Sequence, residues 1–316
     1  MKVVYHHSVG PWMKSRLRGL ADSAGLEVAV VEPGDEKALK SKLSEVEVVW
    51  HVLEPFRKED IESAPKLSLI HKFGVGVNTI DIDAASAQNI AVCNMPGSNS
   101  RAVAEATLNL ILSCLRRTSW VHQHLATGGW KLPPNDAESI VELNGRTVGL
   151  IGYGDIPKTM APILKAFGAD ILYTATSEKP DALGEFRDMD SLLLESDIVS
   201  LHVPLTEITA MLLDRGRLES MKPGAILINT ARGGLVDQEA LVDLLNSRHI
   251  ACAGLDVLAQ EPADTGDAIL GLENVVLSPH IAWQTRETLE RSIDLAGENC
   301  RRLRLGEPFQ NQVNEF

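Results

Sequence analysis

The chain has 316 residues, which suggests two domains by size, and 44% of them are hydrophobic, which allows a sizeable core. Its formal net charge of −13 disfavours a nucleic-acid or anionic-membrane partner, because both need a basic surface. The longest apolar run, Leu108–Leu115, is too short to span a bilayer and the start of the chain lacks a signal peptide's apolar region, so we expect a cytoplasmic protein.

Short apolar runs alternate with helical patterns in the first third of the chain. Amphipathic stretches at residues 13–24 and 36–44 separate the first of these runs. This alternation is typical of a parallel sheet covered by helices. The predicted strands are Val3–Tyr5, Val28–Val31, Val46–Val52, Leu67–Lys72 and Ile90–Cys93.

A long helical pattern from Arg101 to about His124 separates this first series from a second one. A loop rich in Gly and Pro follows at residues 128–134, and an amphipathic segment at residues 285–305 ends the pattern. The strands predicted in the second series are Thr147–Ile151, Ile171–Tyr173, Ile198–Leu201, Ala225–Asn229, Ile250–Leu255 and Val275–Leu277. Together the two series predict an α/β fold with two doubly wound parallel-sheet domains, and the cleft between such domains is a natural ligand site.

The cysteines indicate no metal site. Cys93, Cys114, Cys252 and Cys300 include no Cys-x-x-Cys pair. We therefore expect small core residues in a reducing compartment, rather than metal ligands or disulfides.

A strand, a Gly-x-Gly turn and a helical pattern follow one another from residue 147, and this order is the context of a dinucleotide-binding loop. The turn reads Gly152-Tyr153-Gly154-Asp155-Ile156. The first glycine permits the tight turn, and the second lets the backbone approach a pyrophosphate at a helix N-terminus. Pro157 replaces the third glycine, so the close packing of helix on strand is in question, and Asp155 places a negative charge beside the expected phosphates. The alternative interpretation is a plain tight turn.

The strand after this loop lacks the acid that usually binds the ribose of NAD. Ala175 takes the expected acid position, and Thr176 and Ser177 follow it. Ser177 and Lys179 could meet a 2′-phosphate, whereas Glu178 would oppose one. The sequence therefore predicts an NAD(P)(H) site and leaves the preference between NAD and NADP open.

Three reactive side chains of the second half, Arg232, Glu261 and His280, each follow a predicted strand. Taken singly, each is more often a surface or structural residue, but the carboxyl ends of parallel strands meet at one edge of a sheet. A histidine paired with a carboxylate is favoured in its protonated form and can donate a proton to a nascent alkoxide. An arginine can hold a carboxylate bidentately and polarise the adjacent carbonyl, and a nicotinamide can supply a hydride. The three residues therefore predict hydride transfer to a small 2-keto acid.

Eight motifs are spread over nearly the whole chain. They are Phe73-Gly74-Val75-Gly76-Val77-Asn78 with Asp81, Ser98-Asn99-Ser100-Arg101-Ala102-Val103-Ala104-Glu105, Gly152-Tyr153-Gly154, His202-Val203-Pro204-Leu205-Thr206, Asn229-Thr230-Ala231-Arg232-Gly233, Gly254-Leu255-Asp256-Val257, Glu261-Pro262 and Pro279-His280. In combination, these motifs resemble the D-isomer-specific 2-hydroxyacid dehydrogenase family. The resemblance implies that Arg232, Glu261 and His280 are catalytic in an NAD(P)-dependent dehydrogenase of 2-hydroxy acids, or reductase of 2-keto acids.

The resemblance also implies how substrate, cofactor and domains are arranged. Backbone groups at Val75 and Gly76 would hold the substrate carboxylate, and Asp256 would bind the nicotinamide amide. It implies a discontinuous substrate domain of residues 1–98 plus 285–316, an NAD(P)-binding Rossmann domain of residues 99–284, and a homodimer built around the helix at Arg101. The residues placed along the cofactor are Val203, Pro204, Thr230, Ala231 and Arg232.

Two residues bear on the branch of the family. Glu261 argues against the formate dehydrogenases, which carry glutamine there, and Trp283 after His280 resembles glycerate dehydrogenases and hydroxypyruvate or glyoxylate reductases. Substrate specificity is expected from the loops that follow the first-domain strands, at His6, His7, Leu53 and Phe73. Two alternatives remain: an NAD(H)-sensing protein like the family's corepressors, and an oxidoreductase for an oxyanion such as phosphite. The presence of all three catalytic residues disfavours the sensor.

Overall fold

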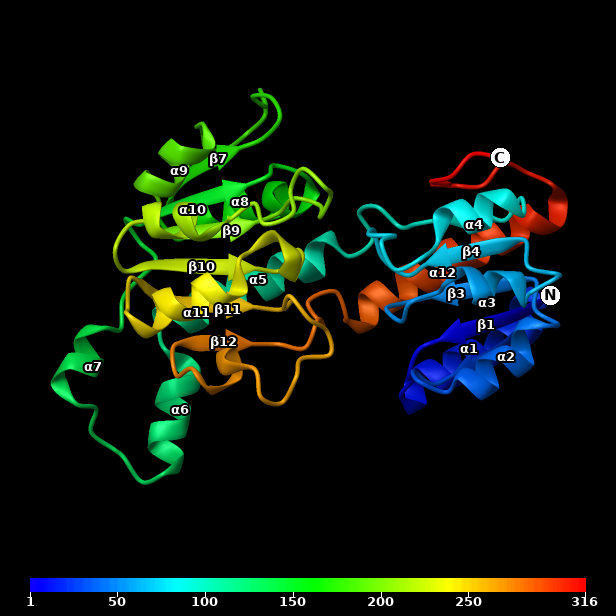
Figure 1. The fold of residues 1–316 in the computed structure, drawn as a ribbon, viewed down its shortest axis with the longest axis horizontal. Helices are drawn as coiled ribbons and strands as arrows, with labels where there is room; N and C mark the ends of the chain where they lie inside the picture. The colour runs from blue at the N-terminus through cyan, green and yellow to red at the C-terminus, as the bar shows by residue number, and fades with distance from the viewer. The chain divides into compact units, whose positions relative to one another are not determined.

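The computed structural model describes residues 1–316, and contacts within the chain divide it into two units. Unit 1 consists of Met1–Asn99 and Thr285–Phe316, and unit 2 is the continuous segment Ser100–Gln284. The boundaries expected from the sequence fall after residues 98 and 284. Each unit contains one parallel sheet with helices packed on it (Figure 1).

The sheet of unit 1 has the strand order β2-β1-β3-β4-β5, and every pairing is parallel. The four residues of β3 and of β4 are all buried, including the polar His51, His71 and Lys72, as expected for central strands of a parallel sheet covered on both faces. The strands are β1 (Lys2–His6), β2 (Glu27–Val31), β3 (Val48–His51), β4 (Leu69–Lys72) and β5 (Ala91–Cys93). The helices are α1 (Pro11–Ala24), α2 (Glu36–Leu43), α3 (Lys58–Glu62), α4 (Ile82–Ala87) and α12 (Arg286–Leu305).

The C-terminal segment completes unit 1 and lies beside strands from the other end of the sequence (Figure 1). Asn299 on α12 donates a hydrogen bond to the buried His71 of β4, over 3.0 Å. Asn314 accepts a hydrogen bond from the Val92 N–H of the edge strand β5, at 2.8 Å, and donates one to the Ile90 carbonyl, at 2.9 Å. The C-terminal segment is therefore part of this unit's core and of its sheet edge.

The sheet of unit 2 has the order β12-β11-β10-β9-β6-β7-β8, again with parallel pairings throughout. Helices lie on both faces of this sheet (Figure 1), as expected for a doubly wound fold. The strands are β6 (Thr147–Ile151), β7 (Asp170–Thr174), β8 (Glu185–Phe186), β9 (Ile198–Leu201), β10 (Ala225–Asn229), β11 (Ile250–Leu255) and β12 (Val275–Leu277). The helices are α5 (Ser100–Leu115), α6 (Thr118–Ala126), α7 (Pro134–Glu138), α8 (Asp155–Ala166), α9 (Met189–Glu195), α10 (Arg215–Ser220) and α11 (Gln238–Asn246), with 3₁₀ turns η1 (Gly233–Leu235) and η2 (Ala268–Gly271).

The prediction of one long helix from Arg101 to about His124 is wrong. The chain forms two helices, α5 and α6, which are separated at Arg117, whose φ of 49° is in the left-handed region. The Arg117 side chain is held by an ion pair of 2.7 Å to Asp136 and lies over the ring of Trp120. No glycine or proline marks this break, and the ion pair that holds Arg117 comes from a residue 19 positions away.

The four cysteines are free and buried, which confirms their prediction as core residues. Burial raises the pKa of the Cys93 and Cys300 thiols to about 12. None of the helices combines the length and the apolar character that are needed to cross a membrane. No group of three His, Cys, Asp or Glu side chains is arranged to hold a metal ion.

Candidate active site

Arg232, Glu261 and His280 converge at one edge of the unit 2 sheet. They follow β10, β11 and β12, which are neighbours in that sheet, so their loops leave from adjacent strand ends. The Nδ1 atom of His280 lies 2.6 Å from Oε2 of Glu261, and the charge of Arg232 acts on the same carboxylate. The convergence expected from the strand order is therefore present within a single unit.

The His280 turn is held by Asp256, a buried carboxylate at the end of β11. Its two oxygens accept hydrogen bonds from the Ser278 hydroxyl at 2.5 Å and from the Ile281 and Ala282 N–H groups at 2.9 Å each. His280 itself has a φ of 54°, a left-handed conformation that costs free energy for a residue with a Cβ. Asp256 therefore stabilises the turn that places the imidazole, a function that sequence reasoning missed.

Glu261 is a loop carboxylate that is tied down at both oxygens. Oε1 accepts a hydrogen bond from the Leu258 N–H at 3.0 Å, while Oε2 faces His280. Burial raises the pKa of Glu261, but the hydrogen bond and charge of His280, the Leu258 N–H and the charge of Arg232 lower it further, so the net pKa is below its ordinary value. The Glu261 carboxylate is therefore ionised at neutral pH and orients His280, leaving the histidine's Nε2 for chemistry.

Arg232 is positioned by the residue that ends β10. Asn229 accepts a hydrogen bond from the Ala231 N–H at 3.0 Å and donates one to the Arg232 carbonyl at 2.8 Å, which closes the turn. A Cβ at Gly233 would lie 1.9 Å from the Leu258 carbonyl oxygen, so glycine is required where this turn packs against the Glu261 loop. Burial lowers the pKa of the half-buried Arg232 guanidinium, and the Glu261 charge counters that effect.

The predicted cofactor loop connects β6 to α8. Gly152 has a φ of 97°, and a Cβ there would lie 2.5 Å from the His202 carbonyl oxygen. Gly154 is the N-cap of α8, and the space beside its Cα is open, as close approach of a pyrophosphate requires. Pro157 is buried in the first turn, where its missing N–H would have no partner in the helix, so the proline is compatible with the packing of α8 on the sheet. The residues present therefore fit a dinucleotide.

The loop after β7 carries the residues expected near the adenosine. Ala175 is half-buried, and Thr176 and Ser177 are exposed directly after it. Two tyrosines that the sequence analysis did not connect to this loop hold its far side: Tyr173 accepts a hydrogen bond from the Lys179 N–H, and Tyr153 accepts one from the Leu183 N–H. The Lys179 ammonium donates to the Ser177 hydroxyl at 3.1 Å.

The other residues predicted to bind cofactor or substrate occupy the same unit, except two, and the four expected to set specificity, His6, His7, Leu53 and Phe73, lie in unit 1. Val203 and Pro204 follow β9, and Thr230 follows β10, where its hydroxyl lies 2.9 Å from that of Thr107 on α5. Trp283 is buried and donates from Nε1 to the His280 carbonyl oxygen, at 3.1 Å. Val75 and Gly76 belong to unit 1, in the loop that follows β4.

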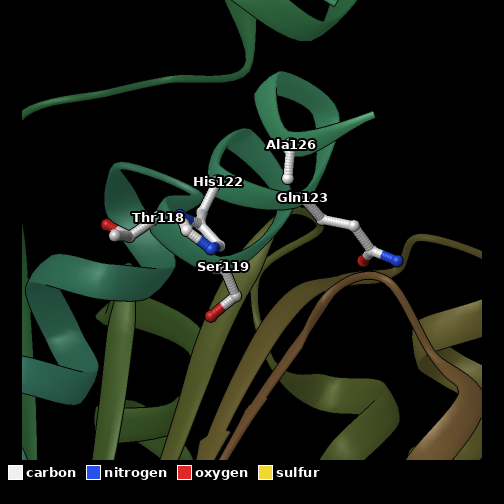
Figure 2. Close-up of a pocket in the computed structure, with 5 residues that line it drawn as sticks. All are labelled: Thr118, Ser119, His122, Gln123 and Ala126. Atoms are coloured by element: carbon white, nitrogen blue, oxygen red, sulfur yellow. The ribbon is translucent and has the colours of Figure 1, made fainter. Parts of the chain in front are cut away.

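A hollow on the surface of α6 contains none of these residues. Figure 2 shows its lining, which comes from α6 alone: Thr118, Ser119, His122, Gln123 and Ala126. We do not assign this hollow to the reaction, because its lining includes neither the group of Arg232, Glu261 and His280 nor the predicted cofactor loop.

Comparison with known proteins gives one match within unit 2 and several over nearly the whole chain. A family model described as D-isomer specific 2-hydroxyacid dehydrogenase, NAD binding domain, matches residues 108–282. A glyoxylate reductase of Korarchaeum cryptofilum is 37% identical over 289 residues, which is 90% of this chain and 87% of that protein. The crystal structure of the TT0316 protein from Thermus thermophilus has a TM-score of 0.90 at 36% identity, covering 99% of this chain and 100% of that one. An NAD-dependent formate dehydrogenase from Staphylococcus aureus, solved in complex with NAD, has a TM-score of 0.90 at 29% identity, covering 100% and 99% of the two chains.

Proposed function

Because the chain belongs to the D-isomer-specific 2-hydroxyacid dehydrogenase family, and so is an NAD(P)-dependent oxidoreductase of 2-hydroxy and 2-keto acids, we propose that it reduces a small 2-keto acid of the glyoxylate or hydroxypyruvate type. The observation that carries this proposal is the 2.6 Å pair of His280 and Glu261 at the strand ends that also present Arg232. The presence of Glu261 and Trp283, and the similarity to glyoxylate reductases, support this choice of substrate class.

In the proposed mechanism, a nicotinamide cofactor, when bound, would supply a hydride to the substrate carbonyl carbon. His280 donates a proton from Nε2 to the carbonyl oxygen as that oxygen becomes an alkoxide, and it takes the proton back in the oxidation direction. Glu261 holds Nδ1, which orients the ring so that Nε2 faces the substrate. Arg232 binds the substrate carboxylate and polarises the carbonyl, so that negative charge develops beside a fixed cation.

The cofactor is proposed to lie along the strand ends of unit 2. The N–H groups at the start of α8 would meet the pyrophosphate, and the loop after β7 would meet the adenosine ribose. Asp256 is proposed to bind the nicotinamide amide, and the Val75 and Gly76 backbone to bind the substrate carboxylate. The remaining residues proposed to contact the cofactor are Gly152, Tyr153, Gly154, Asp155, Ile156, Thr176, Ser177, Val203, Pro204, Thr230 and Ala231. Neither NAD nor NADP is assigned as the preferred cofactor.

We further propose that the protein is a homodimer whose interface includes α6. No residue of α6 is buried within the chain, although the helix carries Trp120, Val121 and Leu125. In the following loop, the side chain of Trp130 is 84% exposed. Figure 1 places α6 outside the helices that cover the sheet, and a second copy of this chain would bury this apolar surface. A cytoplasmic location, and the lack of nucleic-acid or membrane partners, stay predictions.

A panel of 2-keto acids assayed with NADH and with NADPH tests the proposed function. We expect turnover of glyoxylate or hydroxypyruvate, and a fall in kcat of at least ~100-fold in His280→Ala, the usual size of a general-acid contribution. Absence of turnover with every keto acid, together with tight NAD(H) binding, would instead support the sensor. Near wild-type kcat in His280→Ala at neutral pH would exclude this histidine as the proton donor.

A further inference from the structure

Unit 1 contains a buried lysine in contact with the loop proposed to bind the substrate carboxylate. Lys72 is the last residue of β4, and residues 73–79 form the loop that follows it. The side chain of Lys72 is 4% exposed, and its Cε atom lies 3.7 Å from where a Cβ at Gly74 would stand. Lysine is rarely buried to this extent, so its burial beside this loop requires an explanation.

Four carbonyl groups of this loop are hydrogen-bonded, whereas the N–H groups at its centre are not. The carbonyl oxygens of Gly74, Val75, Val77 and Thr79 accept hydrogen bonds from residues 95, 94, 80 and 56. The N–H groups of Val75 and Gly76 take part in no hydrogen bond within the chain, and Val75 is 46% exposed. Successive free N–H groups in a fixed loop form a site for an anion.

Lys72 fixes the far end of this loop. Its ammonium donates to the Val52 carbonyl oxygen and, over 3.4 Å, to the Thr79 hydroxyl. The same hydroxyl lies 2.9 Å from Nε2 of His51, the residue that pairs with Lys72 in the sheet. The loop is thus held at its start by β4 and at its end by Thr79, with the lysine side chain joining the two.

Lys72 is also the charged member of the strand-end cluster that contains it. His6, His51 and Lys72 occupy the paired last positions of three neighbouring strands. Burial lowers the pKa of His6 and of His51, so both imidazoles are neutral near pH 7. The carboxylate of Glu54 acts on the His6 side of the cluster, while the loop lies on the Lys72 side.

We propose that Lys72 is a positioning residue for the substrate carboxylate. Through Thr79 it holds the 73–79 loop in the shape that presents the Val75 and Gly76 N–H groups, and its positive charge, in a buried setting, strengthens the attraction of that loop for an anion. The inference rests on the proposed function, in which this loop receives the carboxylate of a 2-keto acid. Lys72 thereby makes the enzyme prefer a 2-keto acid to the neutral ester of that acid.

The test compares Lys72→Met, which keeps the length of the side chain and removes its charge, with Lys66→Met, which removes an exposed charge of the same unit. Glyoxylate and methyl glyoxylate are the substrates. We expect Lys72→Met to raise the KM for glyoxylate at least ~10-fold, equivalent to about 1.4 kcal/mol, with the KM for the cofactor and the kinetics of the ester unchanged. Equal losses for acid and ester, or an unchanged KM for glyoxylate, would overturn the proposal.

Two further measurements keep the test decisive. If Lys72→Met does not fold, Thr79→Val replaces it: the KM for glyoxylate should rise, and Thr79→Ser, which restores the hydroxyl, should return it to the wild-type value. An unchanged KM in Thr79→Val would overturn the link through Thr79.

If no keto acid is turned over, the proposed function fails separately. Calorimetric binding of oxalate to wild type and to Lys72→Met then decides whether the loop's affinity for an anion depends on the lysine.

Discussion

Replacement of Glu261 by glutamine isolates the charge that faces His280. Glutamine keeps the size of the side chain and an oxygen that can accept from the Leu258 N–H, but it removes the negative charge 2.6 Å from Nδ1. A hydrogen bond to a charged group contributes about 1.5–3 kcal/mol, and water screens this one because 38% of the Glu261 side chain is exposed. The lower end of that range applies, so we expect keto-acid reduction at pH 7 to fall ~10-fold.

The pH dependence of this loss tests the charge of Glu261. Burial raises the pKa of Glu261, but the hydrogen bond and charge of His280, the Leu258 N–H and the charge of Arg232 bring it below its ordinary value, so the carboxylate is ionised from about pH 5.5 to about pH 8. The deficit of Glu261→Gln should therefore persist across this range. The measurement is kcat/KM for glyoxylate at constant ionic strength, in wild type and variant, and wild-type activity of the variant throughout the range would refute the pairing as a catalytic feature.

Three other predictions follow from the structure. Arg232→Lys keeps the charge but loses the two-pronged geometry, so kcat/KM for the keto acid should fall at least ~10-fold, and unchanged kinetics would show that the guanidinium does not contact substrate. Ala175→Asp adds a carboxylate after β7 and should shift the ratio of kcat/KM values toward NADH over NADPH; no shift would place the ribose elsewhere. Burial lowers the pKa of His71 from 6.5 to about 4, so the His71 imidazole takes up a proton more readily in the unfolded chain than in the folded one. The stability that the neutral histidine gives above pH 6.5 should therefore be lost as the pH falls toward 4, by up to ~1.4 kcal/mol per pH unit. Urea denaturation at pH 7 and pH 5 should therefore show a smaller pH effect in His71→Gln than in wild type, and equal effects would contradict the assignment.

The sheets could be predicted because their strands are short apolar runs between turn-forming residues. The predicted runs 147–151 and 250–255 coincide with β6 and β11, and both are almost fully buried. The two-residue strand β8 was not predicted, because Glu185 and Phe186 are exposed and carry no pattern. The end of α5 was also missed, since no glycine or proline marks it and the residue that pairs with Arg117, Asp136, lies 19 residues away in sequence.

The site could be predicted as far as strand order determines it. Arg232, Glu261 and His280 each follow a strand of one parallel sheet, and this topology brings them to one edge whatever their side chains do. The support beneath them could not be predicted. Asp256 holds the His280 turn, and Lys72 contacts Thr79 across a loop. Both contacts depend on the directions of side chains, which a periodic pattern does not encode.

The division of the chain into one continuous and one split unit affects the order in which the protein can fold during synthesis. Unit 2 is complete once residue 284 has left the ribosome, and all of its strands are then available to pair. Unit 1 begins first but finishes last, because its strands β4 and β5 find Asn299 and Asn314 only in the final segment. Until that segment emerges, the edge strand β5 and the buried His71 lack these partners, so the N-terminal part of unit 1 has an open sheet edge during synthesis.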